Sequence, residues 1–172
     1  MNWDVFAYAV SGLLAALLVG TFVEYWVHIL MHRRYFLGKV HTQHHKDGTA
    51  DGWFWEFAAY LGAAIPAAIL GGLAVWLLGW VAFGGGFAVG GFVYAAFAAY
   101  AHQIQHERPE LVFWMARPVH HVHHTHKMWR HNFGISFDIW DRVFGTYQPV
   151  EWVPDPARAR RSLLDFVRIK WV

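Results

Sequence analysis

The sequence predicts an all-α integral membrane protein with about three to four transmembrane helices and a histidine-rich cap on the cytoplasmic side. Of its 172 residues, 56% are hydrophobic and only 15% are charged, which is a more apolar balance than soluble domains have. The apolar residues form long runs, and all 13 histidines fall between His28 and His131, around the ends of these runs. A bilayer suits this distribution, and the length is that of a single domain, 1–172.

The membrane helices are predicted at about residues 5–32, 57–83 and 86–106. The first run exceeds the roughly 20 residues that a helix needs to cross a bilayer, so its last turn should emerge from the lipid. It begins with Asp4 and without Lys or Arg, unlike a signal peptide, and is therefore expected to be retained. The second and third runs should form a helical hairpin that turns at the glycine run 84–86.

A cytoplasmic cap, 107–150, and a basic amphipathic tail, 151–172, should follow the third helix. The tail alternates cationic side chains with apolar ones: Arg158, Arg160, Arg161, Arg168 and Lys170 with Leu163, Leu164, Val167 and Trp171. This pattern fits a helix lying on an anionic leaflet, and it fits a solvated terminal helix equally well.

The cationic residues indicate how the chain is oriented in the membrane. Of the 14 Lys and Arg residues, four follow the first apolar run and ten follow residue 107, whereas the N-terminus and the glycine run carry none. This is the positive-inside pattern, and it places both histidine-rich regions on the cytoplasmic face. Because the charges follow the membrane runs in this way, the pI near 9.0 does not indicate nucleic-acid binding.

The histidines repeat in two alternating patterns, H-x-x-x-H and H-x-x-H-H, each of which occurs twice. They are His28, His32, His41, His44, His45, His102, His106, His120, His123 and His124. On a helix, positions i, i+3 and i+4 share one face, so each pattern can aim its imidazoles at a common point. These ten histidines are therefore the candidate metal ligands.

Ten imidazoles also predict how many metal ions are bound. Without a metal, neutral rings would leave buried nitrogens without partners and protonated rings would repel one another. A zinc ion needs only three or four ligands, so ten favour two metal ions with about five ligands each and positions left open. The chain lacks cysteine and any Glu-x-x-His motif, which excludes thiolate sites and carboxylate-bridged di-iron bundles. Imidazole suits iron, zinc, copper and nickel alike.

Carboxylates are expected to orient the ligand rings by accepting hydrogen bonds from them. Glu24, one helical turn before His28, is one candidate, and Asp138 and Asp141 are two others. The alternative for Glu24 is a pairing with an arginine at the membrane interface.

The order of the four histidine patterns resembles that of the fatty acid hydroxylase and sterol desaturase superfamily of membrane di-iron enzymes. The flanking residues are similar too. Glu24-Tyr25-Trp26 precedes the first pattern, Asn132-Phe133-Gly134 follows the last, and residues 140–147 read Trp-Asp-Arg-Val-Phe-Gly-Thr-Tyr. The resemblance extends over residues 20–150 and implies that the ten histidines bind two iron ions, for which zinc can substitute in a purified protein. His121, His126 and His131 lie outside the family positions, with His131 close enough to orient a ligand or to be an additional ligand.

The resemblance also implies the reaction class. Members are oxidoreductases that use O2 and two externally supplied electrons to hydroxylate or desaturate a fatty acyl, sterol or carotenoid substrate. No fused cytochrome domain precedes the membrane part, so a separate ferredoxin or cytochrome is the expected donor. The short chain is similar to bacterial carotenoid hydroxylases, which implies the bacterial inner membrane, whereas the Asn-Phe-Gly and Trp-Asp signatures look closer to sterol desaturases. Substrate, reaction outcome and oligomeric state stay open.

Two other classes of protein fit part of the pattern. A non-catalytic metal-binding or metal-transporting membrane protein would also gather histidines, but a transporter should place ionisable groups near the bilayer midplane rather than at one interface. A zinc-dependent membrane hydrolase would need a general base, for which Glu107 beside His106 is the candidate, and fewer ligands.

Overall fold

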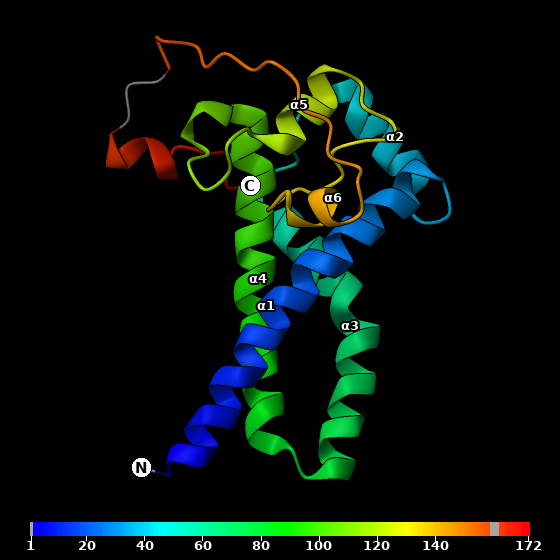
Figure 1. Ribbon diagram of the computed structural model, residues 1–172, viewed down its shortest axis with the longest axis vertical. Helices are drawn as coiled ribbons and strands as arrows, with labels where there is room; N and C mark the ends of the chain where they lie inside the picture. Colours follow the sequence, from blue (N-terminus) through cyan, green and yellow to red (C-terminus); the bar gives the residue numbers. More distant parts are fainter. Residues whose placement is uncertain (1, 159–161) are drawn as a thin grey trace.

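The computed structural model describes residues 2–158 and 162–172, in which the chain is helical and has no strand, as predicted. Three long helices form the body: α1 (Trp3–His32), α3 (Trp53–Leu78) and α4 (Val81–Glu107). The cap at one end of them contains the short elements α2 (Gly38–Asp47), η1 (Pro109–Leu111), α5 (Val119–Thr125), α6 (Ile139–Val143) and η2 (Leu163–Val167). The N-terminus and the α3–α4 turn lie at the opposite end from the cap (Figure 1).

Within the described residues, α1 and α4 are the two helices long and apolar enough to cross a bilayer. Their large side chains face outward: Leu14 and Leu18 on α1, and Val89 and Phe92 on α4, are all more than half exposed. A helix that is apolar on its exposed faces suits lipid rather than water. Helix α3 is a third apolar helix that packs beside α4, and it stays a predicted span.

The turn between α3 and α4 differs from the prediction. Helix α3 ends at Leu78, and the next residue, Gly79, has a φ of 69°, in the left-handed region that glycine adopts readily. The glycine run 84–86 instead lies inside α4, because α4 crosses α1 there: a Cβ added at Gly86 would lie 1.8 Å from the carbonyl oxygen of Ala9. Gly86 thus serves a close contact with α1, Gly84 lies against Val75 of α3, and Gly85 faces open space. The predicted helices 57–83 and 86–106 become α3 and α4.

This contact predicts opposite effects for two neighbouring glycines. Alanine favours a helix interior by about 1 kcal/mol over glycine, so Gly85→Ala, with open space around its Cβ, should keep or raise the melting temperature. Gly86→Ala should lower it by several degrees, because α1 and α4 must move apart. The melting temperatures of both variants can be compared by thermal unfolding in detergent, with tryptophan fluorescence as the signal. Equal melting temperatures would contradict the close crossing.

The buried core lies at the cap end of the molecule. One cluster joins α4 to the cap and the C-terminal segment through Ile104, Leu111, Val119 and Ile169. A second joins α1 to the loop before α6 through Tyr25, Ile29 and Phe133, with Trp140 packed against it. The cap is therefore held to the ends of α1 and α4 by apolar packing, which fixes the segments that carry the histidines.

The described part of the tail is not the amphipathic helix that the sequence predicts. Apart from a turn at 156–158 and η2, it has no regular helix, and it ends across the start of α3: the Trp53 N–H donates to the Lys170 carbonyl at 2.9 Å and the Phe54 N–H to the Trp171 carbonyl at 2.9 Å. The first N–H groups of a helix have no partner within it, so this segment satisfies donors that would otherwise lack one. Arg160 and Arg161 of the predicted tail lie outside the described residues.

Candidate metal centre

The four histidine patterns meet where α1 and α4 enter the cap (Figure 1). Both H-x-x-x-H patterns lie in the last turns of a long helix, α1 or α4, and the H-x-x-H-H patterns lie on α2 and α5. Together they form two groups of ring nitrogens, each close enough to hold one metal ion. The first group is His28, His32, His41, His45 and His123, and the second is His44, His102, His106 and His120.

In the first group the Nε2 atoms face one another. Six pairs of them are separated by 2.9 to 3.3 Å. Two of the rings donate their Nδ1–H to a backbone carbonyl, His28 to Phe133 at 2.6 Å and His123 to His131 at 2.8 Å. A neutral ring protonated at Nδ1 has only a lone pair at Nε2, and two lone pairs cannot hydrogen-bond to each other. A cation between the nitrogens makes this arrangement favourable.

The spacing of these nitrogens also indicates a coordination geometry. At a metal–nitrogen distance of about 2.1 Å, ligands at right angles lie roughly 3.0 Å apart and tetrahedral ligands roughly 3.4 Å apart. Five of the six pairs, at 2.9 to 3.1 Å, match the right-angled spacing, and the sixth, at 3.3 Å, is nearer the tetrahedral one. Five such ligands leave one octahedral position open, so the first group fits an open octahedral metal better than a tetrahedral structural zinc.

The second group has the same construction. The Nε2 atoms of His102 and His44 lie 3.1 Å apart, and those of His106 and His120 lie 3.2 Å apart. The Nδ1 atoms of His44 and His106 bond to the backbone carbonyls of residues 49 and 48, each at 3.1 Å. These contacts orient the Nε2 lone pairs toward the group's centre, as metal ligands require.

The tenth predicted ligand, His124, belongs to neither group. Its ring stacks on His45 with 3.9 Å between centroids and lies 4.6 Å from the ring of His106. Both of its ring nitrogens are buried without a hydrogen-bond partner. Because such nitrogens are costly in a protein interior, His124 is the remaining candidate ligand for the second group.

The three other histidines join neither group. His121 places its Nδ1 3.2 Å from the carbonyl of Gln105, and the side chains of His126 and His131 are exposed. His131 was predicted to orient a ligand or to be an additional one. Its ring joins neither group, but its backbone carbonyl accepts from the Nδ1 of His123.

The histidine rings on α2 and α5 are in the neutral form, which is the form that binds metal. Burial, reinforced by neighbouring imidazoles, lowers the pKa of His44 and His123 to about 3 and that of His45 to about 4. These rings are therefore neutral at pH 7. A metal ion needs no proton to leave before it binds them.

The predicted role of Asp141 needs a correction. Its carboxylate does not contact an imidazole: it accepts from the backbone N–H groups of Phe133 at 2.8 Å and Gly134 at 2.7 Å. The Phe133 carbonyl in turn accepts from His28, so Asp141 acts on the ligand through the loop. Gly134 permits this arrangement, because a Cβ there would lie 2.0 Å from a backbone oxygen.

Glu24 and Asp138 need the same correction. Glu24 accepts from the backbone N–H groups of residues 135 and 136 at 3.0 and 2.9 Å and from the Tyr94 hydroxyl at 2.8 Å. It therefore ties the same loop to α1 and α4 instead of pairing with an arginine. Asp138 pairs with Arg142 at 2.7 Å near the surface. Among these three carboxylates, Glu24 and Asp141 hold the loop behind His28, and Asp138 does not.

The carboxylate that does contact a ligand ring is Glu56, near the start of α3. Its Oε2 accepts from the Nδ1 of His102 at 2.5 Å, and both side chains are largely buried. The sequence contained a signal for it, because Glu56 is a lone carboxylate at the start of an apolar run. The backbone carbonyls that orient the other rings have no such signal, because every residue carries one.

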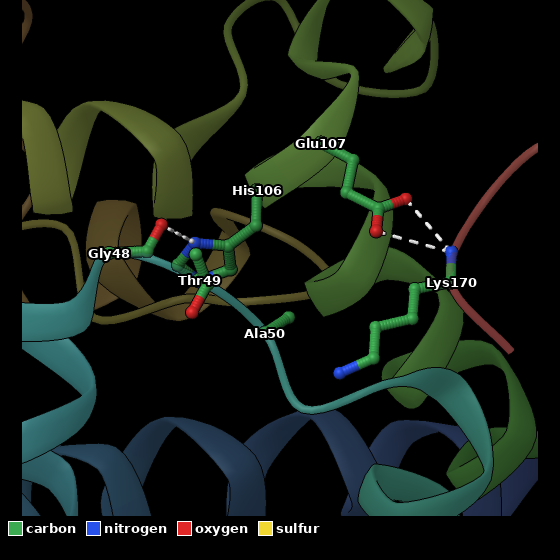
Figure 2. A pocket seen from close by; sticks show the side chains of 6 residues that line it. All are labelled: Gly48, Thr49, Ala50, His106, Glu107 and Lys170. Atoms are coloured by element: carbon green, nitrogen blue, oxygen red, sulfur yellow. Dashed lines mark hydrogen bonds between the residues drawn. The ribbon is translucent and has the colours of Figure 1, made fainter. Parts of the chain in front are cut away.

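A pocket of about 290 Å³ opens beside the second group. It is lined by Gly48, Thr49, Ala50, His106, Glu107 and Lys170 (Figure 2). Both oxygens of Glu107 accept from the backbone N–H of Lys170, at 3.1 and 3.0 Å, and the carboxylate points away from His106 in Figure 2. Glu107 is thus occupied with the C-terminal segment, which argues against its use as the general base of a zinc hydrolase.

Comparison with known families identifies one match. A family model described as fatty acid hydroxylase matches residues 13–146, which is more than half of the chain and includes both histidine groups. No curated protein and no solved structure matches the chain.

Proposed function

Because the chain belongs to the fatty acid hydroxylase family, we propose that it is a membrane di-iron oxygenase that hydroxylates or desaturates a lipid-like substrate. The observation that carries this proposal is the pair of adjacent histidine groups with facing Nε2 atoms. The open octahedral spacing argues against a closed tetrahedral zinc site, and iron, among the metals that imidazole binds, is the one that the family implies. A fatty acyl chain, a sterol or a carotenoid would be the substrate.

The ten predicted ligands would hold the two irons, His124 completing the second group. When bound, the irons supply the redox chemistry that directs O2 against an unreactive C–H bond. The chain's own part is to fix the rings and keep the site dry. Phe133 illustrates both functions: its carbonyl orients His28, and its ring packs 5.4 to 5.9 Å from the rings of His28, His32 and His123.

The position of the site favours a substrate that arrives from the bilayer. The ligands on α1 and α4 lie within the last two turns of these candidate membrane helices, so the metals would sit at the boundary between lipid and cap. With α3 as a third crossing, the N-terminus and the α3–α4 turn would lie outside and the cap in the cytoplasm, as the Lys and Arg distribution favours. We place the protein in a bacterial inner membrane, where a separate ferredoxin or cytochrome would supply electrons.

Metal analysis tests the proposal. Protein purified in detergent from cells grown on enriched iron should contain close to two irons per chain, with the Mössbauer signal of a coupled pair. Incubation of the reduced protein with lipids under labelled O2 then separates the two outcomes, because hydroxylation adds labelled oxygen to the product and desaturation removes two hydrogens without adding oxygen. The proposal would be overturned if the purified protein held only zinc after anaerobic loading with ferrous iron, or if it held no metal in stoichiometric amount.

A further inference from the structure

One large aromatic side chain touches the first histidine group and solvent at the same time. The ring of Trp129 lies 5.3 Å from that of His32 and 5.0 Å from that of His45, measured between centroids. Both histidines belong to the first group, yet Trp129 is 49% exposed. An indole of this size is normally buried when it packs on a core. Trp129 therefore links the surface of the cap directly to two metal-binding rings.

The loop that carries Trp129 is held in place. The preceding Met128 is buried, its N–H donates to the carbonyl of His123 at 2.9 Å, and its sulfur accepts from Asn132 at 3.0 Å. Lys127 has a φ of 52°, in the left-handed region, which turns the chain sharply before Trp129. The exposed indole is thus fixed by its neighbours on both sides.

Cationic side chains accompany Trp129 and the two rings that it touches. Lys127 and Arg130 lie on its own loop, Arg33 follows His32, and Lys46 follows His45. All four are exposed, and none is in an ion pair with a carboxylate of the described residues. The acidic residue closest in sequence, Asp47, accepts from the side chain of Gln43. The loop that carries Trp129 thus presents two exposed cations, Lys127 and Arg130, that have no carboxylate partner in the described part of the chain.

We propose that Trp129 and the cations around it form the docking site of an acidic one-electron carrier protein, and that electrons enter the first metal group through the indole. The inference rests on the proposed function and names the partner's surface chemistry and its place on the cap. Each carrier molecule would lose one electron, so two deliveries would reduce two ferric ions to ferrous ions.

Distance and charge both favour this site. Electron tunnelling slows steeply with distance, and a carrier seated on Trp129 would be separated from two ligand rings by a single indole in contact with both. Complementary charge raises the encounter rate of short-lived complexes, and redox partners typically use small contact areas of this kind. The cations also lie on the cap, the face that a water-soluble carrier can reach.

Anaerobic stopped-flow reduction of the iron-loaded protein tests the docking site, with a reduced acidic plant-type ferredoxin as the probe. The double variant Lys127→Glu/Arg130→Glu should lower the second-order rate constant by roughly tenfold at low ionic strength, and the difference should shrink as salt rises. Its affinity for ferredoxin, measured by thermophoresis in detergent, should fall in parallel. Arg158→Glu, a charge reversal of an exposed arginine on the tail, is the matched control and should leave both quantities unchanged.

Replacement of Trp129 separates the electron path from docking. Because the cations supply most of the attraction, Trp129→Leu should lower the affinity for ferredoxin less than the charge reversal does and keep the iron content, but it should lose most of the rate of reduction within the saturated complex. Trp129→Phe should recover part of that rate. Reduction by dithionite, a small molecule with other routes to the metal, should be affected much less.

Three results would overturn the proposal. The first is a wild-type rate of reduction by ferredoxin in both the charge-reversal variant and the Trp129 variants. The second is a Trp129→Leu protein that loses its iron, or whose reduction by dithionite falls as much as its reduction by ferredoxin. The third is a charge reversal that weakens binding to anionic lipid vesicles but not to ferredoxin. A wild-type protein that binds no iron would instead overturn the proposed function, so the two failures are distinguishable.

Discussion

Replacing His123 with alanine should remove the iron of the first group and abolish oxygenase activity. His123 is fully buried, and its Nε2 lies 2.9 Å from that of His32 and 3.3 Å from that of His45, so it is one of the facing nitrogens that would hold the metal of the first group. Loss of a residue that only hydrogen-bonds to a metal ligand already lowers metal affinity or activity by roughly 10- to 100-fold. Loss of the ligand itself should have a larger effect. Iron content by mass spectrometry and product formation from lipid measure the effect.

His126→Ala is the matched control for this variant. His126 lies three residues further along the same segment, is exposed and belongs to neither group, so its variant should keep both irons. Circular dichroism of both proteins shows whether the helices persist. If His123→Ala retained a coupled pair of irons, or if His126→Ala lost iron to the same extent, the assignment of the first group would be wrong.

The second large effect is expected from Asp141→Ala. This change removes the acceptor of two buried backbone N–H groups, those of Phe133 and Gly134, and of the Thr146 hydroxyl at 2.6 Å. Each buried donor left without a partner costs about 1 to 3 kcal/mol, so the cap should be destabilised by roughly 3 to 5 kcal/mol. The Phe133 carbonyl would also lose its fixed position behind His28, and iron affinity should fall with stability.

Asp138→Ala provides the comparison, because both carboxylates lie on the same short segment. The Asp138–Arg142 pair is near the surface, where ion pairs contribute about 0 to 1 kcal/mol. Thermal unfolding and iron retention during dialysis against a chelator should therefore separate the two variants clearly. Similar losses in both would show that Asp141 does not hold the loop as its hydrogen bonds indicate.

The hydrogen bonds of Asp141 connect the sequence motifs that flank the histidines. Asp141 belongs to Trp-Asp, Phe133 and Gly134 to Asn-Phe-Gly, and Thr146 to Phe-Gly-Thr. The Tyr25 hydroxyl of Glu-Tyr-Trp lies 2.9 Å from the Thr146 hydroxyl, which connects α1 to this network. Residues more than a hundred positions apart thus build one support behind His28.

Several features of the protein could be predicted from local sequence alone. The apolar runs indicate membrane helices, because hydropathy depends on composition over a short window. The histidine spacings indicate ligands, because i, i+3 and i+4 share one face of any helix. Two of the three carboxylates chosen near the histidines do belong to the supporting network, although neither contacts a ring.

Other features depended on which segments meet. The glycine run 84–86 has the composition of a turn, and only the approach of α1 to Gly86 shows that it is part of a helix contact. Glu56 and His102 are 46 residues apart and are brought together by the packing of α3 on α4. The lone carboxylate of Glu56 in an apolar segment marks it as a candidate, but nothing in either local sequence identifies His102 as its partner.

The sequence by itself determined that this is a helical membrane protein of the fatty acid hydroxylase family with ten candidate ligands. Only the tertiary structure decided how nine of them divide into two groups and left His124 beside the second. Each H-x-x-H-H pattern contributes to both groups: His44 and His120 face one, while His45 and His123 face the other. The helix period sets the directions in which these rings project, but the crossing of α1, α2, α4 and α5 sets what they point at, and that crossing is a product of long-range packing.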